Sequence, residues 1–394
     1  MRVLWAKTDY LHPTHRGGQI RTLEILKRLH KRHEIHYVAL YDGTEPEGPE
    51  RAGEYSSRHF PVRHRAPDKR SLAFAGQLVA GLFDPLPVAV ARYRCGAMKK
   101  QIEALRAQFQ YDAVVCDFLF PAPNLAVLED VLLFQHNVES MIWRRRTENA
   151  PTILHRLYEG LQARRMRVYE GSVCQAVRRV IGVSADDATQ MQESYGVPDV
   201  GFVATGVDAG FFAPPEEAPH KADLVFLGSM DWMPNAEGAT WFVKEILPRI
   251  RQTHPDATVA LVGRKPTPQV TSLGRQAGVI VTGTVDDVRP WLHGARVSIV
   301  PLRIGGGTRL KIYEAMAAGA PVVSTSIGAE GLGLRDGEQI LLGDSPDQFA
   351  ARCCEMLGNE DARRRLGAAG REHVVRCCSW DAVTDQFERF LCPG

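Results

Sequence analysis

The residues best suited to chemistry lie in one stretch, where three consecutive glycines precede two cations and a carboxylate. Bare glycine backbone approaches a ligand closely, and the N–H groups at a helix N-terminus favour an anion such as phosphate. Lys311 and Glu314 stand three residues apart and share one face of the helix that follows. The pattern predicts a nucleotide-diphosphate site, with ribose hydroxyls at Glu314. Its members are Gly305, Gly306, Gly307, Thr308, Arg309, Lys311 and Glu314.

Two common nucleotide-binding motifs do not occur in the sequence. There is no G-x-x-x-x-G-K-[ST] loop, and no G-x-G-x-x-G follows the first apolar segment, which weakens a dehydrogenase interpretation. The plain alternative is a tight turn between a strand and a helix that merely packs. Three glycines in a row make such a turn entropically unfavourable unless something requires the bare backbone.

Short apolar strands alternate with helical patterns along the whole chain, which predicts an α/β protein with parallel sheets wrapped by helices. The glycine-rich turn follows one of these strands, so its ligand should lie at the carboxyl edge of a sheet. Helices are expected at 19–30 and 153–175, among others. The expected strands are 3–7, 34–39, 113–116, 131–135, 180–183, 201–204, 223–227, 258–262, 279–282, 297–302, 321–324 and 339–342.

A chain of 394 residues exceeds one ordinary domain, and a proline-rich stretch divides it. Residues 212–220 contain three prolines and no apolar periodicity, which is typical of an interdomain linker. We expect two Rossmann-like domains in series, at 1–211 and 221–378, with the active site in a cleft between them. The remaining residues, 379–394, are expected to form a C-terminal helix.

The composition is that of a soluble globular protein, with 44% hydrophobic and 24% charged residues. No apolar run approaches the about 20 residues that span a bilayer, and the N-terminus resembles a strand more than a signal peptide. We therefore expect a cytoplasmic protein. The eight cysteines include no C-x-x-C pair, which favours reduced thiols over a metal site or a disulfide framework.

Residues 51–100 are strongly basic, with ten Lys and Arg against three Asp and Glu. These cations flank an apolar stretch at 72–90. Such a segment could bind peripherally to the anionic inner face of a membrane, or it could bind an anionic acceptor. A solvated basic face beside a buried helix is the equally weighted alternative.

The segment 305–319, together with 226–232 and Pro234-Asn235 upstream, resembles the donor half of glycosyltransferases with the GT-B fold, and family 4 most of all. The N-terminal half agrees with this resemblance, because Gly17-Gly18 follows the first strand and the segment 135–139 follows another. Further matching segments are 184–187 and 206–208. The resemblance implies an acceptor-side domain at 1–211, a donor domain at 221–378 and a last helix that returns to the N-terminal domain.

Members of this family transfer a sugar from a nucleotide diphosphate to an acceptor hydroxyl with retention of configuration and without a bound metal. The sequence fits that last property, since it contains no D-x-D pair. By resemblance, Arg309 and Lys311 neutralise the leaving diphosphate, Glu314 binds the ribose, and His136 contacts the donor sugar near the reacting carbon. Glu139 is a weaker candidate for a direct role. The remaining donor-side candidates are Gly17 and Gly18 beside the phosphates and Thr284 and Val285 beside the base.

Two departures from the family pattern concern the donor. Many relatives have a glutamate eight residues before the ribose glutamate, where this chain has Gly306, so backbone N–H groups must replace that carboxylate. Many also carry an Arg and a Lys soon after the first strand of the C-terminal domain, but residues 228–232 read Gly-Ser-Met-Asp-Trp. Arg309 and Lys311 should therefore neutralise a larger share of the negative charge of the phosphates.

The sequence thus predicts a bacterial-type glycosyltransferase for a UDP- or GDP-type sugar, acting in polysaccharide or glycoconjugate biosynthesis. The acceptor stays open among glycans, lipid-linked sugars and small molecules, and no nucleic acid is expected as a partner. A nucleotide-sugar epimerase of the same architecture is one alternative, and it would need acid/base carboxylates but no acceptor. A non-catalytic nucleotide-sugar-binding protein is the other.

Overall fold

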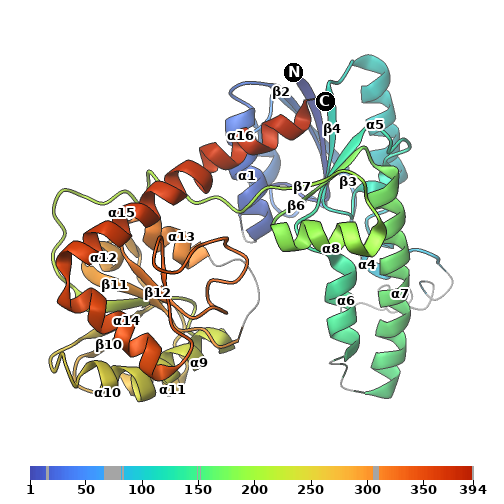
Figure 1. Ribbon diagram of the computed structural model, residues 1–394. Helices are drawn as coiled ribbons and strands as arrows, with labels where there is room; N and C mark the ends of the chain where they lie inside the picture. The colour runs from blue at the N-terminus through green and yellow to red at the C-terminus, as the bar shows by residue number, and fades with distance from the viewer. Residues whose placement is uncertain are drawn as a thin grey trace. The chain divides into compact units, whose positions relative to one another are not determined.

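The computed structural model describes residues 1–14, 17–65, 81, 84–148, 150, 152–304 and 310–392. The chain divides into two compact units (Figure 1). The N-terminal unit comprises Met1–Ala204 and Val383–Gly394, and the C-terminal unit comprises Thr205–Ala382. The linker expected at 212–220 lies just after this point of division.

The N-terminal unit is built on a seven-stranded parallel sheet with the order β3-β2-β1-β4-β5-β6-β7. Its central strands are buried along their whole length, as the continuous apolar runs require when helices cover both faces. The strands are β1 (Arg2–Lys7), β2 (Glu34–Tyr41), β3 (Arg58–Arg63), β4 (Ala113–Asp117), β5 (Val131–Phe134), β6 (Arg179–Gly182) and β7 (Val200–Phe202).

Helices connect these strands in the right order for a doubly wound fold. The principal ones are α1 (Gly17–Leu29), α5 (Gly96–Gln108), α6 (Glu139–Glu148), α7 (Ile153–Ala176) and α8 (Ala185–Tyr195). Shorter helical turns are α2 (Glu47–Glu50), η1 (Ala52–Glu54), α4 (Val88–Ala91) and η2 (Ala122–Asn124). The N-terminal turn of α7 is capped by Thr152, whose side chain accepts a hydrogen bond from the His155 N–H.

The C-terminal unit contains a six-stranded sheet with the order β10-β9-β8-β11-β12-β13, again parallel throughout. Its strands are β8 (Ala222–Leu227), β9 (Val259–Val262), β10 (Val279–Gly283), β11 (Ala295–Val300), β12 (Val322–Ser324) and β13 (Leu341–Leu342). Its helices are α9 (Met233–Trp241), η3 (Phe242–Ile246), α10 (Leu247–Ile250), α11 (Pro268–Leu273), α12 (Arg289–His293), α13 (Leu310–Ala317), α14 (Pro346–Gly358) and α15 (Glu360–Cys377).

The last helix, α16 (Trp380–Leu391), packs on the N-terminal unit, as expected. The Phe387 ring lies 5.4 Å from the Trp5 ring and 4.9 Å from the Phe134 ring, centroid to centroid. Arg32, just after α1, forms ion pairs with Asp385 and Glu388 of α16. The end of the chain therefore completes the hydrophobic core that its first strand begins.

The expected α/β class and paired parallel sheets are confirmed, and every expected strand is present with its ends shifted by at most two residues. Strand β3 was not expected. It lies at the edge of its sheet, carries Pro61 in its middle and exposes most of its side chains, so it lacks the apolar signal of a buried strand. None of the described helices is both long and apolar enough to cross a membrane.

Candidate active site

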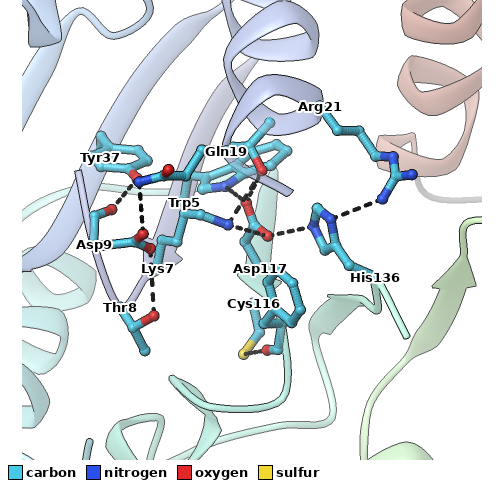
Figure 2. Close-up of polar contacts among 12 residues, drawn as sticks. Trp5, Lys7, Thr8, Asp9, Gln19, Arg21, Tyr37, Cys116, Asp117 and His136 are labelled. Atoms are coloured by element: carbon cyan, nitrogen blue, oxygen red, sulfur yellow. Dashed lines mark hydrogen bonds and ion pairs between the residues drawn. The ribbon is translucent and has the colours of Figure 1, made fainter. Parts of the chain in front are cut away.

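The carboxyl ends of three adjacent strands bring the first group of functional residues together. Lys7 ends β1, Asp117 ends β4 and His136 stands two residues after β5, and these strands are neighbours in the sheet. Arg21 and Thr22 reach the same place from α1, as Figure 2 shows for Arg21. In parallel sheets this edge is where ligands bind.

The Asp117 carboxylate is the centre of this group and is fully buried. It accepts hydrogen bonds from Lys7 Nζ at 2.8 Å, Trp5 Nε1 at 2.9 Å and Thr22 Oγ1 at 2.7 Å. His136 Nε2 lies 2.8 Å from Oδ1, the same oxygen that accepts from Lys7, while Trp5 and Thr22 donate to Oδ2 (Figure 2). A buried carboxylate with this many donors is both desolvated and compensated, so the group is held rigidly.

The contacts of His136 fix its tautomer. Its Nδ1 lies 3.1 Å from Arg21 Nη1, and a guanidinium can only donate, so Nδ1 must be the acceptor. The proton is then on Nε2, which donates to Asp117. His136 is therefore a neutral imidazole with both nitrogens engaged, and a direct hydrogen bond to a sugar requires one of these partners to be exchanged.

The electrostatics agree with this assignment. Burial, reinforced by the Lys7 and Arg21 cations, lowers the pKa of His136 to about 4 despite the opposing effect of Asp117. Burial acts to raise the pKa of Asp117, but the Lys7 ammonium and His136 outweigh it and hold the pKa well below the usual range. Burial also lowers the pKa of Arg21 to about 10, which leaves it charged at neutral pH.

Close packing around His136 explains one of the two expected glycines. The Phe118 ring stacks on the His136 ring at 4.0 Å, and Phe118 holds a φ of 73°, a strained value for an aromatic residue. A Cβ atom on Gly18 would lie 3.0 Å from the Phe118 ring and 3.4 Å from His136 Nδ1. Only glycine lets α1 begin this close. A Cβ on Gly17 would meet nothing within 4 Å.

A second buried carboxylate, Glu170 of α7, holds the segment that carries His136. It accepts from the Gln135 side chain at 2.9 Å, from the N–H groups of Glu139 and Ser140 at 2.8 and 2.9 Å, and from Tyr195 Oη at 2.6 Å. The two N–H groups open α6, so Glu170 caps that helix from a distance. Burial and the neighbouring Glu170 raise the pKa of Glu139 to about 7.

The edge of the C-terminal sheet presents a different arrangement, centred on Lys311 in the first turn of α13. Lys311 Nζ donates to Asn235 Oδ1 at 2.6 Å and lies 4.6 Å from the centre of the Phe226 ring at the end of β8. A Cβ on Gly228 would come within 3.0 Å of Lys311 Nζ, so this glycine makes room for the cation. The ammonium is thus positioned by β8 and α9.

Glu314 lies one helical turn beyond Lys311. Its side chain is partly buried, and no residue that the structure describes hydrogen-bonds to its carboxylate. Burial raises its pKa, and the Lys311 charge opposes the shift only in part. A carboxylate that is half withdrawn from water without a donor is energetically unfavourable unless a ligand supplies one.

Arg264, which the sequence offers only as a weaker candidate for donor contact, reaches the loop after β8. Arg264 follows β9, and its Nε donates to Ser229 Oγ at 2.8 Å. The two loops approach closely at Gly263, where a Cβ would lie 1.7 Å from the Gly228 carbonyl oxygen. Many relatives carry an Arg and a Lys in the segment that corresponds to 228–232. In this chain Arg264, from the loop after β9, brings one cation to the same place.

The other expected donor residues divide into two sets. Thr284 is exposed and Val285 half-buried just after β10, at the same edge of the sheet. Five residues lie outside the part of the chain that the structure describes: Gly305, Gly306, Gly307, Thr308 and Arg309.

Asp117, Lys7 and Arg21 were not identified from the sequence. A signal for two of them exists, because Lys7 and Asp117 are charged residues at the carboxyl ends of apolar strands. Arg21 lies within an ordinary amphipathic helix and carries no such signal. Asn235 was noted only as part of a motif, without its contact to Lys311.

The comparisons with known proteins agree with this geometry. Residues 221–359, which include Asn235, Lys311 and Glu314, match the family "Glycosyl transferases group 1". The matched segment makes up most of the C-terminal unit and places that unit among the group 1 glycosyltransferases. The protein is therefore a glycosyltransferase that uses a nucleotide sugar, and the family expected from the sequence is confirmed.

Two relatives and one solved structure illustrate the similarity. An uncharacterized 44.6 kDa protein of the cps region of Klebsiella pneumoniae is 21% identical over 89% of both chains. A phosphatidyl-myo-inositol mannosyltransferase of Mycobacterium tuberculosis is 30% identical over 57% of this chain and 62% of its own length. Anabaena HepE, solved with UDP and glucose, has a TM-score of 0.62 at 12% identity over 99% of both chains, which shows a shared fold.

Proposed function

We propose that this glycosyltransferase moves a sugar from a UDP- or GDP-type donor to an acceptor hydroxyl, with retention of configuration and without a metal. The observation that carries the donor assignment is the pair on α13. Lys311 offers a positioned ammonium, and Glu314 offers a partly buried carboxylate without a donor among the described residues. A ribose diol would supply the donor that Glu314 lacks among the described residues, and a diphosphate would add a counter-charge beside the Lys311 ammonium.

The donor phosphates would be neutralised by Lys311, Arg309 and Arg264, assisted by N–H groups at the start of α13. Glycines 305–307 and Thr308 would approach the phosphates and the sugar, while Thr284 and Val285 would lie beside the base. HepE, a protein of the same fold, was solved with UDP and glucose, which supports the uridine alternative.

The acceptor would bind the N-terminal unit in a pocket of about 380 Å³ at the carboxyl ends of β1, β2 and β3. Its lining is polar and includes the carboxylates of Asp9, Asp42 and Glu45 with the rings of Tyr10 and Tyr41. Carboxylates that accept from hydroxyls, beside aromatic faces, suit a hydroxyl-rich group. Gln19 of α1 orients Asp9, since its Nε2 donates to Asp9 Oδ2 at 3.0 Å (Figure 2).

His136, Gly17 and Gly18 would lie on the donor sugar side of this unit, with His136 held neutral by Asp117 and Arg21. In the proposed reaction the acceptor oxygen attacks the anomeric carbon on the face that the diphosphate leaves. The bond between the anomeric carbon and the phosphate oxygen breaks as the new glycosidic bond forms. The leaving phosphate oxygen takes the proton of the acceptor hydroxyl. Lys311 and Arg309 lower the barrier by stabilising the charge that develops on the diphosphate.

The test is Lys311→Ala in a transfer assay with a panel of UDP- and GDP-sugars and hydroxyl acceptors, run with a chelator. We expect turnover to fall by about a hundredfold or more, because an electrostatic contact to the leaving group is lost. Lys244→Ala, which removes an exposed lysine of the same unit, is the matched control. Equal turnover in both variants would contradict the donor assignment, and loss of activity with chelator alone would contradict metal independence.

The two alternative functions give different results in the same assay. An epimerase converts a donor to a new isomer when no acceptor is present. A non-catalytic binding protein shows a raised melting temperature with a nucleotide sugar but no transfer to any acceptor of the panel. Group 1 membership favours the transferase over both.

A further inference from the structure

Helix α7 exposes a row of large apolar side chains that none of the described residues of the N-terminal unit covers. Ile153 is 77% exposed, Leu154 78%, Leu157 68% and Val168 67%, and Leu161 is also exposed. Isolated exposed leucines are ordinary on a protein surface, but five large apolar residues on one helix are not.

These residues form one continuous stripe. At 3.6 residues per turn, positions 153, 154, 157, 161 and 168 fall within an arc of about 100°. The side of α7 that packs into the unit is a different one and carries Gln162, Met166 and Val173. The stripe runs for about 23 Å along the helix at 1.5 Å per residue. In Figure 1 this part of α7 lies beside α6, beyond the sheet of its own unit.

Positive charge surrounds the stripe. Together α6 and α7 contain seven arginines and four glutamates, a balance of 7 − 4 = +3. Two of the glutamates, Glu139 and Glu170, are buried. The other two are paired, Glu148 with Arg144 at 3.7 Å and Glu159 with Arg146 at 3.0 Å.

The arginines of α7 stand beside the apolar stripe and within it. Arg164 falls inside the arc of the stripe, and Arg156 and Arg167 fall about 40 to 60° to one side of it. Arg165 falls about 20° to the other side, where its guanidinium donates to the Gly81 carbonyl oxygen. Long arginine side chains at these places can extend to a polar layer while the apolar residues go deeper.

We propose that the α6–α7 hairpin docks on an anionic lipid bilayer, with the stripe at the acyl boundary and the arginines on the headgroups. An apolar face with arginines along its margins is the pattern of a helix that lies in the membrane surface. A second copy of the chain fits less well, because a symmetric contact would place the same arginines against each other. This surface is formed by residues of α6 and α7 and not by the basic segment 51–100, and the proposal does not depend on the proposed function.

The experiment is sedimentation of the full chain with lipid vesicles. We expect binding to phosphatidylcholine vesicles that contain about 30 mol % phosphatidylglycerol, and little binding to phosphatidylcholine alone. The double variant Leu154→Ser/Leu157→Ser should bind the anionic vesicles at least about tenfold more weakly. Arg156→Gln/Arg167→Gln should weaken binding by about twenty-five-fold, the product of about fivefold for each arginine.

Val127→Ser, which changes an exposed apolar residue of the same unit outside the hairpin, should bind like the wild type. Melting temperatures of all variants check the fold. The proposal is overturned if the wild type binds neither kind of vesicle or binds both equally. It is also overturned if the wild type is a dimer in solution that Leu154→Ser/Leu157→Ser dissociates.

Discussion

The buried charged groups at the carboxyl edges of the two sheets differ in how completely they are hydrogen-bonded within the protein. In the N-terminal unit, Asp117 receives four protein contacts, and each nitrogen of His136 has a partner. In the C-terminal unit, Lys311 is held by Asn235, but Glu314 is half-buried with no donor among the described residues. The first edge is complete without a ligand, and the second is not.

This difference separates a frame from a binding site. A network whose members satisfy each other adds rigidity, and its loss should be measured mainly as lost stability. A carboxylate left without a donor adds little to stability and is compensated when a ligand binds. Substitutions at the two edges should therefore affect different quantities.

The largest effect is expected for Asp117→Asn, which leaves the buried Lys7 ammonium without its counter-charge. Removing one partner of a buried ion pair should lower the free energy of unfolding by about 3 to 5 kcal/mol, measured by urea denaturation. Asp130→Asn breaks the more exposed pair with Arg106 and should cost below about 1 kcal/mol. If both substitutions cost the same, the network is not the frame of the unit.

The pH dependence of stability should be the next largest effect. Because the pKa of folded His136 is about 4 and its ordinary value is 6.5, the unfolded chain binds the extra proton between these values. His136 therefore makes stability fall as the pH drops from 6.5 towards 4, by up to about 3 kcal/mol. In His136→Asn that contribution should vanish, while the other histidines keep theirs. The free energy of unfolding is measured by denaturation at several pH values between 6.5 and 4. If it changes with pH by the same amount in the wild type and in His136→Asn, His136 is not a buried neutral imidazole.

A smaller effect is expected for Glu314→Gln, and in binding rather than stability. The amide keeps the shape but loses a charged acceptor, so UDP or GDP should bind about tenfold more weakly by calorimetry. Since burial raises the pKa of Glu314, wild-type binding should also weaken as the pH falls through that pKa, and the variant should lack this dependence. Glu245→Gln, at an exposed position within η3, serves as control. A large loss of stability in Glu314→Gln would instead show that Glu314 stabilises the fold and would contradict its role in binding.

The sequence revealed what is encoded locally. Lys311 and Glu314 could be proposed from the sequence because their spacing lies within a single helix, and the buried strands were predicted correctly because their apolar runs are continuous. Asp117 and Lys7 are 110 positions apart and meet only through the strand order β1-β4, which a single sequence does not specify. Strand β3 was missed for a related reason, since Pro61 and exposed basic residues make it resemble a loop.

The placement of Phe387 against Trp5 and Phe134 has a consequence for biosynthesis. The residues of α16 that close the first core leave the ribosome long after the strands that they cover. While the residues between the N-terminal sheet and α16 are being synthesised, an aromatic surface of this sheet stays exposed. Growing chains with such exposed surface aggregate or recruit chaperones. A ribosome that stops before Val383 therefore releases a protein whose N-terminal unit is unfinished.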